Sequence, residues 1–266
     1  MTTAWTVDTV AAELLAAADA PRSRGSISAT WPGLDVGTAY AAQDRALSLR
    51  LARGEQLTGV KLGVTSRTKQ RQVGVDRPST AWLTDEMVLP AGAPVPRNRL
   101  VQPRAEPEIA FVMGERLAGP GVTAASALRA VLYVVGAIEI IDSRFSGYEF
   151  SMADAVADNN SSGFFLTGPV VRRPDTLDLA MEACLLEVDG EIVDSATGAA
   201  VYGNPAEALA FAANTLAERG RAIEAGWTVL TGGMTDAAPI APGARIAAHF
   251  THLGSLTLDG GGHADH

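Results

Sequence analysis

Two glutamates separated by a single residue, Glu106 and Glu108, are the first candidates for chemistry in this sequence. They come just before an apolar run, and residues i and i+2 of a β-strand point to the same face of a sheet. Carboxylates held side by side repel each other, and a hard divalent cation between them relieves that repulsion. The pair therefore indicates either a metal site or a solvated strand face without a ligand.

A third carboxylate, Glu139, interrupts the apolar stretch 136–141. Burying a carboxylate without a partner costs several kcal/mol or raises its pKa. Two interpretations remain open, namely an ion pair with Arg144 or another arginine, and a third metal ligand beside Glu106 and Glu108. Three carboxylates with open coordination positions suit Mg²⁺ or Mn²⁺ better than Zn²⁺.

Lys61 lies between apolar neighbours on a predicted strand, and two hydroxyl residues, Thr65 and Ser66, follow it. A lysine in this setting either snorkels to the surface or faces a cleft, where it can bind a carboxylate or carry a proton. Gly63 and the glycine pair 232–233 would let the backbone approach a ligand closely.

Histidine is confined to the last eighteen residues, at positions 249, 252, 263 and 266. His249 and His252 are three residues apart on a predicted strand and so point to opposite faces. This disfavours both a histidine-rich zinc site and a Ser-His-Asp triad. Catalysis is then left to carboxylates, lysine, hydroxyl groups or a metal ion.

The elements that must position these residues follow from periodicity and end signals. Helices are predicted over 8–19 with Asp8 as N-cap, and over 36–53, 66–72, 123–131 and 204–220. Strands are predicted over 60–65, 105–113, 134–142, 227–230 and 245–258, with a hairpin over 184–193. Residues 74–99 and 143–163 are predicted to be loops, the first rich in proline and glycine and the second polar. Strands outnumber helices after residue 100, which indicates an α+β chain with an antiparallel or mixed sheet.

Composition excludes several classes of function. The net charge of −9 over 266 residues argues against a nucleic-acid partner. The longest apolar run, 130–138, is too short to span a bilayer, and no signal peptide is visible, so we expect no membrane partner. A single cysteine, Cys184, precludes an internal disulfide and fits a reducing cytoplasm.

Five segments match one known family in order, namely residues 61–66, 104–111, 138–144, 157–162 and 230–233. Together they resemble the hydratase/decarboxylase branch of the fumarylacetoacetate hydrolase superfamily. That branch includes 2-keto-4-pentenoate hydratases and 4-oxalocrotonate decarboxylases of meta-cleavage pathways. The resemblance covers residues 8 to 258, nearly the whole chain.

The resemblance implies the superfamily's mixed β-roll with an N-terminal helical part. Residues 1–90 would carry the lysine strand and its loop, and residues 91–266 the metal site, in one integrated domain. It implies Mg²⁺ or Mn²⁺ bound by Glu106, Glu108 and Glu139, and a small 2-oxo acid as substrate. It also implies a homo-oligomer, with a hydratase or decarboxylase of the same pathway as a candidate partner. The implied catalytic residues are Lys61 and Ser161, and the implied substrate-binding residues are Thr65, Ser66, Arg104, Asn159 and Thr231.

One departure from the family bears on the reaction. Hydratases of this branch commonly carry Pro-Asp-(Phe/Tyr)-Gly after the lysine motif, whereas Ser79 and Ala81 replace the Asp and the Gly here. That Asp is a candidate for activating water, which decarboxylation of a vinylogous β-keto acid does not need. The run 231–235 also resembles the decarboxylases. The sequence thus predicts a 2-oxo-3-hexenedioate decarboxylase, with two alternatives: a 2-hydroxypenta-2,4-dienoate hydratase, in which Asp76 or Asp85 replaces the missing acid, and a non-catalytic partner subunit.

Overall fold

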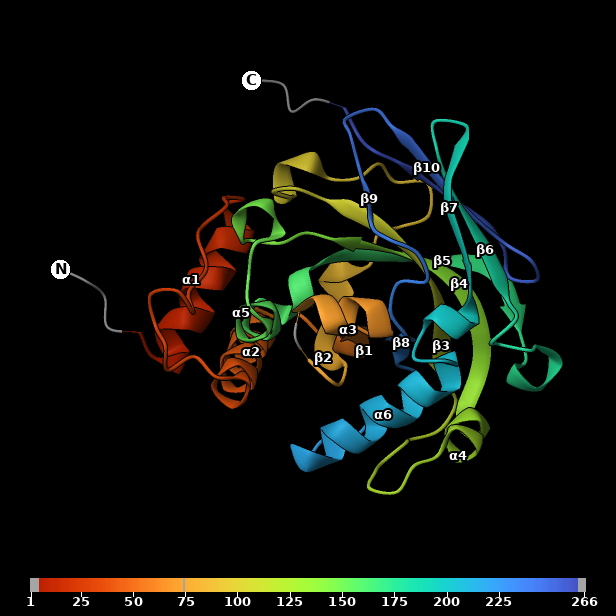
Figure 1. Cartoon of the computed structure of the whole chain (residues 1–266), viewed down its shortest axis with the longest axis horizontal. Coiled ribbons are helices and arrows are strands. Elements are labelled where there is room, and N and C mark those ends of the chain that lie inside the picture. Colours follow the sequence, from red (N-terminus) through yellow and green to blue (C-terminus); the bar gives the residue numbers. More distant parts are fainter. Residues whose placement is uncertain (1–4, 74, 263–266) are drawn as a thin grey trace.

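Two β-sheets occupy the centre of the structure, a computed structural model that describes residues 5–73 and 75–262. In the described part, the strands are β1 (Leu57–Gly63), β2 (Ser79–Thr84), β3 (Arg104–Met113), β4 (Val131–Ile141), β5 (Ser162–Arg172), β6 (Ala183–Val188), β7 (Glu191–Thr197), β8 (Thr228–Leu230), β9 (Ala238–Pro239), β10 (Arg245–Phe250) and β11 (Gly254–Asp259). The α-helices are α1 (Val7–Asp19), α2 (Val36–Ala52), α3 (Arg67–Val73), α4 (Ala124–Arg129), α5 (Met152–Ala157) and α6 (Pro205–Glu218). Helices α1 and α2 lie together with α5 on one side, and the sheet of β6, β7 and β10 lies on the other (Figure 1).

The larger sheet has the strand order β2-β1-β8-β3-β4-β5, with β9 also paired to β3. Strands β1 and β8 are parallel, and the other neighbours are antiparallel. The smaller sheet has the order β11-β10-β6-β7 and is antiparallel throughout. The predicted α+β chain with a mixed sheet is confirmed. The strand that carries Lys61 lies two places from the strand that carries Glu106 and Glu108.

The main hydrophobic core joins both sheets to α6. Its fully buried members include Phe111 on β3, Ile138 on β4, Leu186 on β6 and Leu209 on α6. Each Å² of apolar surface removed from water stabilises the fold by about 25 cal/mol, so this cluster is the main source of stability. No helix in the described part of the chain is long and apolar enough to cross a membrane.

Of three predicted N-caps, two are confirmed and one is wrong. Thr123 caps α4, and Asn204 caps α6 with Pro205 at its first position. Helix α1 begins one residue earlier than predicted, and its cap is Thr6 rather than Asp8. The Thr6 hydroxyl accepts the backbone N–H of Thr9, and the Thr9 hydroxyl accepts that of Thr6, which completes a capping box.

Both predicted loops contain regular structure. Strand β2 lies within 74–99 and pairs with β1 along its whole length, and each of its residues is buried. Proline and glycine flank these six residues but do not occur among them, so the composition of the whole segment concealed a short strand. Helix α5 lies within 143–163 and is capped by Ser151. His252 lies in the turn after β10 rather than on a strand, and His263 and His266 lie outside the described residues.

A buried carboxylate, Asp154 on α5, attaches the N-terminal part of the chain to the β-roll. It accepts hydrogen bonds from the backbone N–H groups of Ile27 and Ser28 and from the hydroxyls of Ser26, Ser28 and Ser151. Burial alone would raise the pKa of Asp154, but the hydrogen bonds from the three serines outweigh it and lower the pKa. The charged form is therefore the one that this site stabilises.

We expect Asp154→Asn to lower the free energy of unfolding by about 3 kcal/mol, because a buried amide cannot accept all of these donors. Since the folded pKa lies below the ordinary value of 3.8, the contribution is present above that pH and is lost as the pH falls through the folded pKa. Urea denaturation at neutral and acidic pH measures both effects. Asp8→Asn, which removes an exposed ion pair to Arg45, is the control and should change stability by less than about 0.5 kcal/mol.

Candidate metal centre and active site

Glu106, Glu108 and Glu139 converge at one point of the larger sheet. Strands β3 and β4 are antiparallel neighbours, and Glu106 lies directly opposite Glu139 in their register. One carboxylate oxygen from each of the three lies within 4.8 Å of the other two. Strand periodicity places Glu106 and Glu108 on one face of β3. The register between β3 and β4 adds Glu139, which completes a three-carboxylate site.

The surroundings of these carboxylates fit a divalent cation. Glu108 and Glu139 are buried, and Glu106 is half-buried. Glu108 Oε2 accepts the backbone N–H of Gly232 at 2.7 Å. Glu108 Oε1 and Glu139 Oε2 have no hydrogen-bond partner among the described residues. Buried orphan oxygens of this kind are the ligands that Mg²⁺ and Mn²⁺ prefer.

Without a cation, these groups resist ionisation. Burial raises the pKa of Glu108 well above its usual value of 4.5, and the nearby Glu139 and Glu106 raise it further. Burial also raises the pKa of Glu139, against the opposing influence of Lys61. Mutual repulsion in a dry site therefore opposes full ionisation, and a bound dication would reverse that balance.

Lys61 on β1 faces the metal centre rather than the surface. Its Nζ donates to Glu139 Oε1 at 2.5 Å and to the backbone carbonyl of Asn160 at 2.8 Å, and its side chain is 3% exposed. The expected alternative partner of Glu139, Arg144, instead pairs with Asp158. A buried lysine beside a candidate metal ligand is placed to hold a proton at this site.

The glycine pair after β8 provides the space that the carboxylates occupy. A Cβ atom added to Gly233 would lie 2.8 Å from the Glu106 Cδ. Gly232 has φ +110°, and a Cβ there would lie 2.2 Å from the Thr65 hydroxyl oxygen. Only glycine satisfies both constraints, so this turn can press against the centre while its N–H donates to Glu108.

A cavity of about 420 Å³ opens onto this centre. Five residues predicted from sequence line it, namely Lys61, Thr65, Arg104, Glu106 and Ser161. The Arg104 guanidinium stacks over the ring of Tyr148 at 4.1 Å, and Tyr148 also lines the cavity. The cavity thus presents two cationic side chains beside the carboxylate site, an arrangement suited to a small anionic ligand.

Three of the predicted substrate-binding residues do not line the cavity. The Thr231 side chain is fully buried, and its hydroxyl donates to the carbonyl of Ile109. The Asn159 amide binds both backbone groups of Trp82, at 2.9 Å each. Ser66 is half-buried, and its carbonyl accepts the N–H of Gln70 at the start of α3. Their roles as substrate contacts stay predictions.

Sequence reasoning singled out Asn159 and passed over its neighbour Asn160, which lines the cavity. Asn159, Asn160 and Ser161 all have positive φ, at 50°, 50° and 58°. Three successive left-handed residues turn the Asn159 side chain toward β2 and the Asn160 side chain toward the cavity. Two successive asparagines are compatible with left-handed backbone, but residue type alone does not show which of the two side chains faces the cavity.

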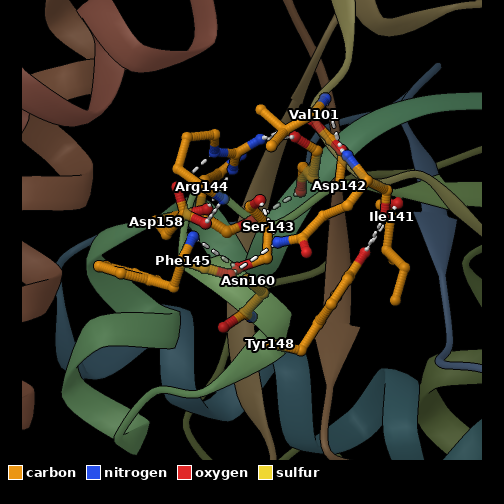
Figure 2. A network of polar contacts seen from close by, with 12 residues as sticks. Val101, Ile141, Asp142, Ser143, Arg144, Phe145, Tyr148, Asp158 and Asn160 are labelled. Carbon is orange, nitrogen blue, oxygen red and sulfur yellow. Dashed lines mark hydrogen bonds and ion pairs between the residues drawn. The ribbon is translucent and has the colours of Figure 1, made fainter. Parts of the chain in front are cut away.

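A buried polar network holds this turn in place (Figure 2). Arg144 donates through Nε to the Asp158 carboxylate at 2.5 Å and through a terminal nitrogen to the Asp158 carbonyl at 2.8 Å. Its other terminal nitrogen donates to the carbonyl of Ser162 at 3.1 Å. Asp142 donates its backbone N–H to the carbonyl of Ser161. These contacts on both flanks fix the strained segment and with it the carbonyl that receives Lys61.

Comparison with known proteins identifies the family. The family model described as "Fumarylacetoacetate (FAA) hydrolase C-terminal" matches residues 51–259. The chain is 39% identical over 227 residues to a 4-oxalocrotonate decarboxylase of Pseudomonas sp. strain CF600, covering 85% of this chain and 86% of that protein. It is 37% identical over 254 residues to a 2-hydroxyhexa-2,4-dienoate hydratase of Comamonas testosteroni, covering 95% of this chain and 96% of that protein.

The fold agrees with these relatives. The structure of 4-oxalocrotonate decarboxylase from Pseudomonas putida G7, complexed with magnesium and adipate, superimposes with a TM-score of 0.93 at 36% identity. The match covers 95% of this chain and 96% of that one, so the N-terminal helices are included. The predicted mixed β-roll with an N-terminal helical part is confirmed. The chain belongs to the fumarylacetoacetate hydrolase family, among its lyases that act as decarboxylases or hydratases in meta-cleavage pathways.

Proposed function

We propose that this chain is a metal-dependent decarboxylase of 2-oxo-3-hexenedioate-like acids. The observation that carries the choice is Ser79, which is fully buried and donates its hydroxyl to Asn160 Oδ1 at 3.0 Å. Hydration needs a base that takes a proton from water. A serine hydroxyl engaged in this way is neutral and offers no such base beside Lys61.

The aspartates considered as replacements lie elsewhere. Asp76 lines a separate cavity with Tyr40 and Arg219. Asp85 accepts the backbone N–H of Gln56 near the end of β2. Asp236 does line the active-site cavity, but it is exposed to solvent. A carboxylate that faces solvent is hydrated rather than held in the buried part of the site beside Lys61, so it does not favour hydration.

The diacid substrate is supported by the cavity and by the relatives. Arg104 offers a cationic group to one carboxylate of an anionic substrate, whereas Lys61 is already paired with Glu139. The Pseudomonas putida G7 enzyme, whose structure holds adipate, is named for decarboxylating a diacid. Adipate and 2-oxo-3-hexenedioate share the same six-carbon length.

The reaction then follows from the placement of this chain's residues. A Mg²⁺ or Mn²⁺ ion held by the three glutamates would supply positive charge that draws electrons toward the 2-keto oxygen. Arg104 would bind the carboxylate next to the ketone and orient the chain. The bond to the distal carboxylate breaks, CO₂ leaves, and the electron pair moves through the conjugated chain to the 2-oxygen. Lys61 donates the proton that this oxygen takes, which yields a 2-hydroxy-2,4-dienoate.

An assay of the purified protein against two substrates tests this proposal. With Mg²⁺ present, we expect 2-oxo-3-hexenedioate to release one CO₂ per molecule consumed, and we expect EDTA to stop the reaction. Turnover of 2-hydroxypenta-2,4-dienoate to a 4-hydroxy-2-oxo acid without CO₂ would instead identify a hydratase. The hydratase relative at 37% identity keeps that alternative open. Tight Mg²⁺ binding with no turnover of either compound would identify a non-catalytic subunit.

A further inference from the structure

We propose that the side-chain amide of Asn160 binds the distal carboxylate of the diacid and that the Ser79 hydroxyl orients this amide. The proposal rests on the proposed function for the identity of the substrate. It assigns a specificity role to a residue that the sequence did not single out, and a positioning role to the residue that replaces the family's aspartate.

The position of the Asn160 amide follows from its left-handed backbone, with φ 50° and ψ 41°. Its carbonyl receives Lys61 Nζ, while its side chain lies over Gly63. A Cβ atom at Gly63 would lie 3.1 Å from Asn160 Nδ2 and 3.2 Å from its Cγ. The absence of a side chain at position 63 therefore leaves the place that the amide fills, on the wall of the cavity next to the catalytic lysine.

The orientation of the amide follows from Ser79. Its hydroxyl donates to Asn160 Oδ1, which leaves Nδ2 as the end of the amide that is not engaged. Asn160 as a whole is 8% exposed. Its Nδ2 is buried and has no hydrogen-bond partner among the residues that the structure describes. A buried N–H₂ group without an acceptor is destabilising, so its retention on a cavity wall points to a ligand oxygen as the missing acceptor.

The two walls of the cavity then suit the two ends of a diacid. Arg104 on β3 carries a positive charge, and Asn160, on the turn before β5, carries a neutral donor; both line the cavity. The leaving carboxylate loses its charge as it becomes CO₂. A cation on that group would stabilise the starting acid more than the transition state, whereas a neutral amide orients it with a smaller penalty. The charged donor is accordingly better placed on the carboxylate that stays.

A pair of inert ligands isolates the distal contact. 2-Oxoadipate and 2-oxohexanoate have the same chain and the same metal-chelating end, and only the first has a distal carboxylate. We expect calorimetric titration at saturating Mg²⁺ to show that the wild-type protein prefers 2-oxoadipate. Asn160→Asp, which tolerates the left-handed backbone and replaces the donor with a charge, should reduce that preference on the order of 10- to 100-fold. Asn160→Gly, which also accepts positive φ, should reduce it by about tenfold.

The role of Ser79 is tested by the same two ligands. Ser79→Ala removes the hydrogen bond that orients the amide, and we expect it to reduce the preference by about fivefold while 2-oxohexanoate binding is retained. Thr84→Ala is the matched control, because Thr84 is a buried hydroxyl residue on the same strand whose bond goes to Glu55, away from the cavity. It should leave the preference unchanged.

Equal weakening of both ligands by the Asn160 variants would overturn the proposal, because it would place the amide at the metal-chelating end. Unchanged binding of both ligands would overturn it too, as would a wild-type protein that binds them equally. These titrations need no turnover. A protein that prefers 2-oxoadipate through Asn160 but releases no CO₂ from 2-oxo-3-hexenedioate would refute the decarboxylase and leave this binding site in place.

Discussion

Glu108→Gln is expected to reduce Mg²⁺-dependent turnover by at least about a thousandfold and, at the same time, to stabilise the metal-free protein. The first effect follows from the loss of one of three converging carboxylate ligands. The second follows from the environment of Glu108, which is fully buried and has one oxygen without a partner among the described residues. An amide of the same shape removes the repulsion with the other two carboxylates.

The stabilisation should amount to about 1–3 kcal/mol in the presence of EDTA. The Gly232 N–H can still donate to the carbonyl oxygen of the introduced amide, so the one hydrogen bond that Glu108 now accepts is retained. A carboxylate that served only the fold would give the opposite sign. Opposite changes in activity and stability are what a site built for a metal should show.

Glu182→Gln provides the matched control. Glu182 is also buried, but its carboxylate accepts the backbone N–H groups of His252 and Leu253 and contacts the His252 ring. Both of its oxygens are thus satisfied within the fold. We expect this variant to lose stability and to keep the Mg²⁺ affinity of the wild-type protein.

Glu108 also makes the stabilisation by Mg²⁺ depend on pH, and the sign of this dependence can be worked out. Because burial raises the folded pKa of Glu108 above its usual value of 4.5, folding without metal favours the protonated form. The contribution of Glu108 to the stability of the metal-free protein is therefore fully present below its unfolded pKa and is lost as the pH rises through the folded pKa. Mg²⁺ binds the ionised form, so the rise in Tm that it causes should be larger at about pH 8 than at about pH 5.

Differential scanning fluorimetry with Mg²⁺ or EDTA at both pH values measures these effects in the wild-type protein and the two variants. In Glu108→Gln the dependence of the metal-free Tm on pH should be weaker. A Glu108→Gln protein that is less stable than wild type in EDTA, or one that still turns over substrate at the wild-type rate, would contradict a metal ligand at this position.

Sequence reasoning reached the three converging glutamates because strand periodicity is a local property. Glu106 and Glu108 had to share a face once 105–113 formed a strand, and Glu139 stood out as a charge in an apolar strand. The partner of Glu139 in its ion pair could not be predicted from the sequence in the same way. Arg144 is five residues from Glu139 along the chain, whereas Lys61 is 78 residues away and meets it only because β8 joins β1 to β3, which pairs with the strand of Glu139.

The parts of the site that sequence reasoning missed depend on backbone geometry rather than on residue type. The distinction between Asn159 and Asn160 rests on which side chain a left-handed turn directs into the cavity. The burial of Ser79 rests on β2, a short strand hidden in a segment rich in proline and glycine. The residue types at these positions can be read from the sequence. The direction of each side chain cannot, because it is set by the tertiary contacts that hold the turn and the strand edge.

Lys61→Met is expected to reduce kcat by about a thousandfold at saturating Mg²⁺, because methionine keeps the apolar stem and removes the proton donor. The loss should have two separable parts. Lys61 opposes the rise in the pKa of Glu139, so its removal raises that pKa further and weakens Mg²⁺ binding at neutral pH, by about tenfold. Excess Mg²⁺ restores occupancy of the site, and the reduction in kcat that remains then measures what the ammonium group contributes to the chemical step.

A small amine added from solution separates proton transfer from simple charge. Lys61→Ala leaves a space beside Glu139 and the Asn160 carbonyl that methylamine or ethylamine can enter, since both acceptors of Nζ are fixed by the surrounding strands and the turn. If Lys61 donates the proton, kcat should recover with added amine and should depend on the pKa of the amine used. Recovery by guanidinium ion to the same extent would assign only an electrostatic role, because a guanidinium does not give up a proton at neutral pH. A Lys61→Met protein that keeps more than about a tenth of the wild-type kcat at saturating Mg²⁺ would remove this lysine from the mechanism altogether.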